Sequence, residues 1–330
     1  MNINILLLIF FTLITILILC PISNKMGLID LPNKRKLHKI NAKLIGGLVL
    51  MLNFILLIFL INLNKELDSL LKFSIIVGII GLIDDKYEIN AFEKLILISF
   101  PILLITLNNF NLMSLGGYNI IGEIKLGKFS IILTFLASLL FVNATNYIDG
   151  KDGVLITMFL LINSKLIFLI NNSEDISKYL LIYVNVFLLI LLFFNATNIK
   201  KLKIFLGDSG SLLIGFFLGF ILIYLANNNL SHPILLASAV TVIVFDFLSV
   251  SIERLINNNG KIFKPDNNHI HHLIYNKTNS NIKTVLIINF INIFFFIINY
   301  NIYKIYDLLA LIIFIVEFFI FFILRKVLIK

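Results

Sequence analysis

Long apolar runs separated by short polar connections dominate the pattern of this sequence. Most runs approach the roughly 20 residues that an α-helix needs to cross a bilayer. They predict eleven transmembrane helices, centred at roughly residues 13, 54, 77, 100, 138, 162, 187, 218, 242, 294 and 316. We therefore expect an all-α, polytopic integral membrane protein with a single membrane-embedded domain over 1–330.

Composition leads to the same class. Hydrophobic residues make up 59% of the chain and charged residues 14%, and the mean hydropathy is +1.02. Soluble domains carry about a quarter charged residues, so that class is excluded. Cys20 is the single cysteine, so we expect no intrachain disulfide and no cysteine metal site. The first residues carry no positive charge and no small-residue cleavage site follows, so the first apolar run is expected to remain as a helix.

Lysine and arginine gather in alternate connections, and this sets the expected orientation. Cytoplasmic loops carry an excess of these residues. The first, seventh and ninth connections and the tail hold Lys25, Lys34, Arg35, Lys36, Lys39, Lys43, Lys200, Lys201, Lys203, Arg254, Lys261, Lys264, Lys277, Lys283, Arg325, Lys326 and Lys330. With eleven spans these segments share one side, so we expect the N-terminus outside and the C-terminus in the cytoplasm.

Four polar clusters interrupt the apolar pattern, and all of them fall in connections expected to be cytoplasmic. They are Asp84-Asp85, the run 143–153 (NATNYIDGKDG), the run 207–211 (GDSGS), and the histidine group 269–272 (HIHH). The orientation was derived from positive charges alone, so this agreement supports a common site. Carboxylates and histidines at one water-facing rim predict chemistry on an anionic, phosphorylated substrate.

The acidic residues allow a functional and a plain interpretation. Asp84 and Asp85 are adjacent like charges that repel unless a cation or metal compensates them, although a solvated helix end would also carry such a pair. Asp149 and Asp152 are each followed by glycine, which lets backbone approach a ligand closely. Asp-Gly pairs are also ordinary turn signals. Asp208 could ligate a hard cation beside a phosphate-binding helix start, and a simple N-cap would look similar.

The histidine group has no cysteine nearby, and the carboxylates favour an oxygen-ligating ion over zinc. Mg²⁺ suits carboxylates combined with substrate phosphates. The lone residues His38 and His232 are, on spacing alone, more typical of structural or solvated histidines. Asp246 and Glu317 lie in apolar surroundings, where a carboxylate is a functional hypothesis by default. We expect Asp246 to approach the site and Glu317 to make an interhelical hydrogen bond.

Five motifs in order resemble those of the polyprenyl-phosphate N-acetylhexosamine-1-phosphate transferases. They are DLPNKRKLHKINAKLIGG (30–47), GLIDDKYEIN with Lys94 following it, NATNYIDGKDG, FLGDSGSLLIGF and PDNNHIHHLI. The HIHH form resembles the members that use UDP-GlcNAc more than those that use UDP-MurNAc-pentapeptide. The chain is therefore identified as similar to this family over most of its length.

The resemblance implies an activity. It is the transfer of GlcNAc-1-phosphate from UDP-GlcNAc to undecaprenyl (polyprenyl) phosphate with release of UMP, dependent on Mg²⁺ or alternatively Mn²⁺. Another UDP-acetamidosugar or UDP-MurNAc-pentapeptide is the alternative donor, and direct attack and a covalent aspartyl intermediate are both open. The resemblance also implies the cytoplasmic face of a bacterial inner (cytoplasmic) membrane, no nucleic-acid partner, and leaves a homodimer open.

The resemblance also implies three groups of site residues. The expected metal ligands are Asp208 and Asn146. The expected catalytic residues are Asp84, Asp85, Asp149, Asp152 and Lys94. The expected substrate-binding residues are His269, His271, His272, Asn143, Arg35, Lys36 and His38, of which the last three belong to the basic first loop that could attract the lipid phosphate.

The sequence departs from the family pattern in a few places. Lys43 replaces the proline that usually precedes the glycine pair, Glu88 occupies the third acidic position, and Lys151 stands at a usually apolar position. The connection 195–205 is altered in length, so no family role is carried onto Asn195 or Asn198.

A membrane transporter of an anionic solute is the competing class. It would carry inverted repeats and charges near the middle of the membrane. Here the charges crowd one rim and no convincing repeat is visible, so the enzyme is favoured.

Overall fold

The computed structural model describes residues 4–30, 42–108, 110–150, 153–171, 174–197, 199, 202–257 and 268–329. The chain divides into two compact units, Met1–Phe110 with Ser173–Ile221, and Asn111–Asn172 with Leu222–Lys330. The expectation of a single domain over 1–330 stays a prediction.

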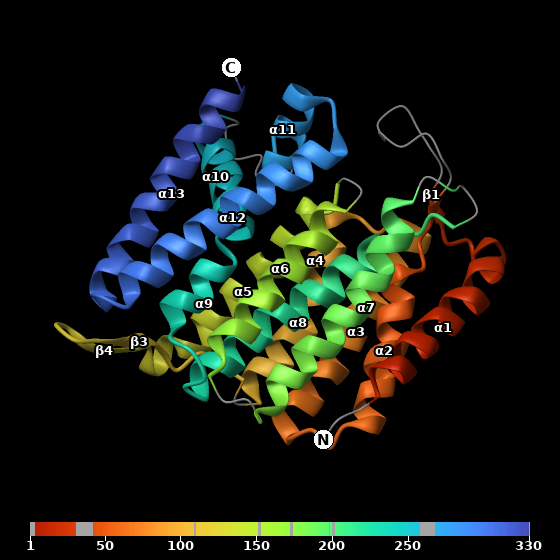
Figure 1. The fold of residues 1–330 in the computed structure, drawn as a ribbon, viewed down its shortest axis with the longest axis horizontal. Helices are drawn as coiled ribbons and strands as arrows, with labels where there is room; N and C mark the ends of the chain where they lie inside the picture. Colours follow the sequence, from red (N-terminus) through yellow and green to blue (C-terminus); the bar gives the residue numbers. More distant parts are fainter. Residues whose placement is uncertain are drawn as a thin grey trace. The chain divides into compact units, whose positions relative to one another are not determined.

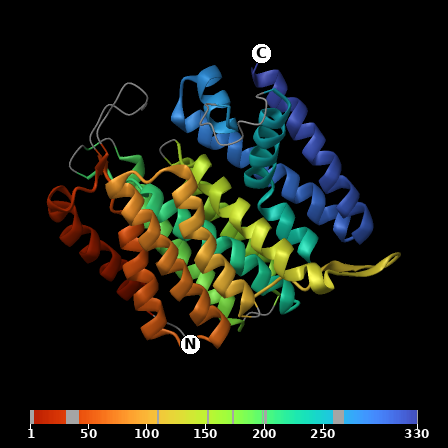
Figure 2. The ribbon, with the colours of Figure 1, turned by 180° about the vertical axis from the view of Figure 1, so that it is seen from behind.

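The first unit is a helical bundle with one short strand pair. Its elements are α1 (Ile5–Met26), β1 (Ile29–Asp30), β2 (Ala42–Lys43), α2 (Gly46–Leu60), α3 (Lys65–Tyr87), α4 (Ala91–Leu107), α7 (Ile176–Ala196) and α8 (Gly207–Asn227), the last belonging to this unit up to Ile221. Helices α1, α2 and α7 lie side by side (Figure 1), and α3 packs between α2 and α4, as the view from behind shows (Figure 2).

Local side chains set the turn between α3 and α4. Glu88 takes a left-handed conformation (φ 49°) and ends α3. The Asn90 side chain then accepts a hydrogen bond from the Glu93 N–H and caps α4. Helices joined by so short a turn lie antiparallel. The first turn of α4, which carries Lys94, therefore faces the last turn of α3, which carries Asp84 and Asp85.

Two glycines let α8 approach its neighbours closely. A Cβ at Gly47 on α2 would lie 2.3 Å from the backbone nitrogen of Gly210. A Cβ at Gly81 on α3 would lie 2.5 Å from the backbone oxygen of Asp208. Only glycine fits at such distances. The GDSGS run is therefore held directly against the end of α3.

Lys43, where the family pattern has proline, forms backbone contacts beside this run. Its N–H donates to the Lys203 carbonyl at 3.2 Å, and its carbonyl accepts from the Phe205 N–H at 2.9 Å. Proline has no N–H to donate. Lysine at this position therefore adds a hydrogen bond between β2 and the segment that leads into α8.

The second unit contains the remaining helices and a hairpin. Its elements are β3 (Ser114–Tyr118), β4 (Gly122–Lys125), the 3₁₀ turn η1 (Gly127–Phe129), α5 (Ser130–Ile148), α6 (Val154–Leu169), α9 (Pro233–Ala239), α10 (Thr241–Asn257), α11 (Ile270–Thr278), α12 (Asn281–Tyr303) and α13 (Asp307–Ile329). Helices α12 and α13 form an antiparallel pair, and α12 also packs on α6, α9, α10 and α11 (Figure 1).

A sharp bend of 75° separates α9 from α10. Lys165 of α6 lies at this break, where its ammonium donates to the carbonyl of Ala239, the last residue of α9, at 3.4 Å. The same ammonium donates to the backbone and side-chain oxygens of Asn292 on α12 at 3.0 and 2.8 Å. Lys165 thus satisfies the carbonyl of Ala239, one of those that the end of α9 leaves without a partner within the helix.

The hairpin of β3 and β4 is fixed to α9 by His232. Nε2 of His232 lies 3.1 Å from the Gly117 carbonyl, and Nδ1 accepts from the Ile234 N–H at 3.3 Å, which caps α9. Gly116 (φ 112°) lies against the ring, because an added Cβ would be 2.5 Å from it. The structural interpretation of His232 agrees with these contacts.

The all-α membrane class is confirmed. Every one of the eleven expected centres lies in a helix. Within the described residues, six helices are long and apolar enough to cross a membrane, or seven if the bent α9–α10 pair is one span. Helices α2 and α6, with 15 and 16 residues, would span roughly 22–24 Å, less than a hydrocarbon core of about 30 Å. The count of eleven spans and the orientation stay predictions.

Glu317 of α13 was expected to form an interhelical hydrogen bond. Its carboxylate accepts from the side-chain amide of Asn299 on α12. Both residues are buried. The expectation is confirmed, and the bond joins the two helices of the antiparallel pair.

Candidate active site

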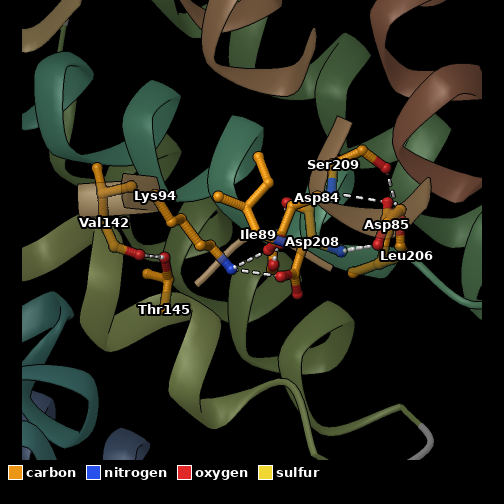
Figure 3. Close-up of polar contacts among 10 residues, drawn as sticks. Asp84, Asp85, Ile89, Lys94, Val142, Thr145, Leu206, Asp208 and Ser209 are labelled. Carbon is orange, nitrogen blue, oxygen red and sulfur yellow. Dashed lines mark hydrogen bonds and ion pairs between the residues drawn. The ribbon is translucent and has the colours of Figure 1, made fainter. Parts of the chain in front are cut away.

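In the first unit, Lys94 joins carboxylates from two other helices (Figure 3). Its ammonium lies 2.7 Å from Oδ2 of Asp84 at the end of α3, and it also bonds Oδ2 of Asp208 in the first turn of α8. Oδ1 of Asp84 accepts from the Ile89 N–H at 2.8 Å. We call Asp84, Asp85, Lys94 and Asp208 the carboxylate cluster.

Asp85 has a different set of partners from its neighbour. Its two carboxylate oxygens accept from the backbone N–H groups of Asp208 and Ser209, at 2.7 and 3.0 Å (Figure 3). A carboxylate here satisfies two free N–H groups of α8 and interacts favourably with the positive end of that helix. Gly207 (φ 69°) makes room for it, since an added Cβ would lie 2.5 Å from Oδ2 of Asp85. Asp85 therefore fixes the start of α8 and with it Asp208.

Accessibility separates the members of the carboxylate cluster. The side chains of Asp84 and Lys94 are 9% and 13% exposed, whereas that of Asp208 is 35% exposed. Asp208 is thus the carboxylate of this ion-paired trio that an incoming ligand reaches most easily.

The donor set of the carboxylate cluster fits Mg²⁺. It holds three carboxylates and one ammonium, so negative charge is in excess and the donors are oxygens, which hard cations prefer. Among the described residues, no group of three or more His, Cys, Asp or Glu side chains is arranged to hold a metal ion. Mg²⁺ is commonly bound by one or two carboxylates together with substrate phosphates, so a partial protein shell is what such a site requires.

In the second unit, the run 143–150 forms the last turns of α5 and its end. The Asn143 amide donates to the Leu139 carbonyl at 2.8 Å. Asp149 occupies the C-cap position, and its N–H donates to the Asn146 carbonyl at 3.2 Å. Helix α5 therefore ends at the expected site residues.

The histidine group lies against this end of α5. His269 is the N-cap residue of α11, and its ring stacks on that of Tyr147 with centroids 5.5 Å apart. Gly150 lies against His271, since an added Cβ would be 2.3 Å from Nε2 of that ring. The rings of His271 and His272 lie 4.0 Å apart. Two motifs separated by more than a hundred residues are thus brought together.

The expected site residues divide between the two units. The first unit holds Asp84, Asp85, Lys94 and Asp208, and the second holds Asn143, Asn146, Asp149, His269, His271 and His272. Arg35, Lys36, His38 and Asp152 lie outside the described residues. The expected metal ligands Asp208 and Asn146 belong to different units, so their joint role stays a prediction, as do the other individual roles.

The acidic residues Asp84, Asp85 and Asp208 lie on helices, whereas the sequence placed their motifs in the connections between helices. Helix α3 continues to Tyr87, so Asp84 and Asp85 are in its last turn, because the left-handed Glu88 ends the helix only after them. Asp208 lies in the first turn of α8. Asn195, for which no family role was carried over, is buried and donates to the Ile204 carbonyl at 3.0 Å.

Sequence reasoning missed two buried cations. Arg325 was counted only as a positive charge of the tail, yet its side chain is fully buried and donates to Glu253. Lys165 was not singled out, although a single lysine within a long apolar run is a visible signal. Arg325 gave no such signal, because a basic pair with Lys326 near the C-terminal end of the sequence is typical of solvated residues.

Comparison with known proteins identifies similar sequences. A family model described as glycosyl transferase family 4 matches residues 67–226. An undecaprenyl-phosphate alpha-N-acetylglucosaminyl 1-phosphate transferase of Escherichia coli O157:H7 is 30% identical over 277 residues, covering 80% of this chain and 73% of that protein. A protein of the same name from Pasteurella multocida is 30% identical, covering 84% and 79%. A probable undecaprenyl-phosphate N-acetylglucosaminyl 1-phosphate transferase of Bacillus subtilis is 27% identical, covering 86% and 81%.

Proposed function

Because the chain belongs to glycosyl transferase family 4, we propose that it transfers GlcNAc-1-phosphate from UDP-GlcNAc to undecaprenyl phosphate and releases UMP. The names of the similar proteins support this donor and acceptor. The observation that carries the proposal is the carboxylate cluster, in which Asp84, Lys94 and Asp208 from three helices meet at the N-terminus of α8. Such a helix start is a favourable place for a phosphate.

The reaction requires that the charge of a diphosphate is offset and that two phosphates are held in line. Phosphoryl transfer depends largely on positioning and charge stabilisation. Asp208 would be a ligand of Mg²⁺, which would supply a Lewis acid and a template for the phosphates. The exposure of Asp208 supports its role as the ligand that meets the incoming donor.

The cluster residues would have separate roles. Asp84 would accept the proton of the lipid phosphate, because its neighbour Asp85 already accepts two backbone N–H groups. Lys94 pairs with both Asp84 and Asp208 and would offset the repulsion between their negative charges. Its positive charge would also attract the phosphate. With Asp84 as the base, a direct attack by the lipid phosphate on the β-phosphorus of the donor needs no covalent intermediate.

The second unit would bind the nucleotide sugar. His269, His271 and His272 would contact the diphosphate or the sugar, and Asp149 and Asp152 would bind the nucleotide. The stacking of His269 on Tyr147 and the contact of Gly150 with His271 support a common site for these two motifs. The basic segment with Arg35, Lys36 and His38 would attract the lipid phosphate.

The protein is a multi-pass membrane protein. We place it in a bacterial inner membrane, with eleven spans, the N-terminus outside and the C-terminus in the cytoplasm. The alternate distribution of lysine and arginine supports this orientation. UDP-GlcNAc and the bilayer-embedded acceptor would then meet at the cytoplasmic face.

The test is a transfer assay with the purified protein, radiolabelled UDP-GlcNAc, undecaprenyl phosphate and MgCl₂. Wild-type protein should give a labelled lipid whose formation stops when Mg²⁺ is chelated. The variant Asp208→Asn should lower the rate about 100-fold or more, the usual effect of removing one group that stabilises transition-state charge.

The matched control is Asp68→Asn on α3, which removes an exposed ion pair with Lys72. It should leave the rate within about twofold, because exposed pairs contribute little. A labelled lipid formed equally well by Asp208→Asn, or formed without Mg²⁺, would refute the proposed site.

A further inference from the structure

A second group of charged side chains lies in the second unit, where α10, α11 and α13 meet. Asp246 of α10 is fully buried and uses both carboxylate oxygens. Its Oδ2 lies 2.8 Å from Nδ1 of His269, and its Oδ1 accepts from the Ile270 N–H at 2.8 Å. Asp246 therefore binds both the His269 ring and the backbone of Ile270, the first residue of α11.

Arg325 of α13 is the positively charged member of this group. Its Nε lies 3.6 Å from Oδ1 of Asp246. Its Nη2 donates to Oε2 of Glu253 and to the carbonyl of Asn268, both at 2.8 Å. The guanidinium thus fixes Asp246, a second acidic residue two turns further along α10, and the backbone directly before His269.

The contact with Asp246 determines which ring nitrogen of His269 carries a proton. An ionised carboxylate only accepts hydrogen bonds, so the proton lies on Nδ1. The second ring nitrogen, Nε2, has no hydrogen-bond partner among the described residues. The side chain of His269 is nevertheless only 5% exposed. Stacking on Tyr147 fixes the plane of the ring. The ring is thus held in one orientation with one nitrogen unused.

The charges of the group suggest the ligand of that nitrogen. Asp246 is a fully buried carboxylate, Glu253 is a carboxylate that is 13% exposed, and Arg325 is a fully buried cation. If this nitrogen carried a proton as well, Nε2–H would be a donor for an oxyanion. Buried ion groups add little net stability in general, so stability alone does not explain this arrangement.

We propose that Asp246 is a positioning residue that acts through His269. It holds the imidazole so that Nε2–H donates to a phosphate oxygen of the nucleotide-sugar donor, while Arg325 of the last helix holds Asp246 in place. The identity of the ligand rests on the proposed function. The orientation of the ring by Asp246 does not.

A double-mutant cycle tests whether Asp246 acts through His269. The variants are Asp246→Asn, His269→Asn and the double variant, and asparagine at position 269 keeps a favourable N-cap for α11. Asp246→Asn should lower the rate of transfer about 10- to 100-fold, the range known for loss of a carboxylate that orients a metal-bound histidine. In the His269→Asn background the same change should lower it less than about twofold.

A matched control is Glu317→Gln, which alters another buried carboxylate of the same unit, one that accepts a hydrogen bond from Asn299 of α12. It should keep the wild-type rate. An equal effect of Asp246→Asn in both backgrounds would show that Asp246 supports the fold without acting through the histidine, and would overturn the proposal.

A measurement that needs no turnover separates this proposal from the proposed function. Nitrogen-15 NMR of histidine-labelled protein in nanodiscs should show a His269 signal, assigned by its loss in His269→Asn, with Nδ1 protonated. A wild-type signal with a bare Nδ1 would overturn the positioning role, whatever the activity. A protonated Nδ1 in a protein that transfers no GlcNAc-1-phosphate would instead support the orientation and reject the proposed reaction.

Discussion

At the scale of residues, the adjacent carboxylates of α3 differ in what they contact. Asp84 pairs with Lys94, and Asp85 binds two N–H groups at the start of α8. The sequence predicted a shared role for this pair. It could not separate them, because their partners are contributed by two other helices.

Asp85→Asn should loosen the start of α8. An amide keeps one acceptor oxygen but loses the charge and the second hydrogen bond, at a cost of about 1–2 kcal/mol in the free energy of unfolding. Transfer should fall at least about tenfold, because Asp208 loses its fixed position. Thermal unfolding and the transfer assay measure both effects. A variant with wild-type stability and rate would contradict the capping role.

His232 makes stability depend on pH. Burial lowers the pKa of its imidazole below the ordinary 6.5, and the Gly117 carbonyl and Asp307 offset this only in part. The folded protein therefore binds this proton less readily than the unfolded chain does. The stabilisation is complete above about pH 6.5 and is lost as pH falls through the lower pKa of the folded state.

His232→Asn keeps a capping side chain for α9 but cannot titrate in this range. Between pH 7.5 and pH 5, the unfolding midpoint of the wild type should fall by roughly 1–3 °C more than that of the variant. Differential scanning measurements at matched detergent and salt compare the two. Equal slopes in both proteins would show that His232 does not contribute.

At the scale of elements, helices follow from the sequence better than their contacts. The eleven apolar centres all lie in helices. Asn64 and Asn90 cap α3 and α4, and asparagine is favoured at that position. The bend at Val240 was not predicted, because the apolar run continues across it. The close approach of α8 to α2 and α3 depends on Gly47 and Gly81, whose partners lie far away in sequence.

Gly81→Ala tests that close approach. The added methyl group would overlap the backbone of Asp208, so α8 must shift, at a cost of about 1–3 kcal/mol in the free energy of unfolding. Transfer should fall with it, since Asp208 moves. Gly117→Ala is the control, because a Cβ there meets nothing within 4 Å. Equal stability of the two variants would contradict the packing described for α8.

At the scale of the whole molecule, the order of the motifs identified the family correctly. The structure adds which motifs meet within each unit: the end of α3 with the start of α8, and the end of α5 with the histidine group. Such pairing depends on tertiary packing, which hydropathy does not contain. The network of Asp246, His269 and Arg325 was hidden for the same reason, since its residues are spread over about eighty positions.

The most direct test of the central claim follows the β-phosphate of the donor. Purified protein is incubated with undecaprenyl phosphate, Mg²⁺ and UDP-GlcNAc labelled separately in the sugar, the β-phosphate and the uridine. We predict that the sugar and β-phosphate labels enter the lipid together in equal amounts, while the uridine label stays in water-soluble UMP. A lipid that carries the sugar label without the β-phosphate label, or no labelled lipid at all, would contradict the transfer of a sugar phosphate.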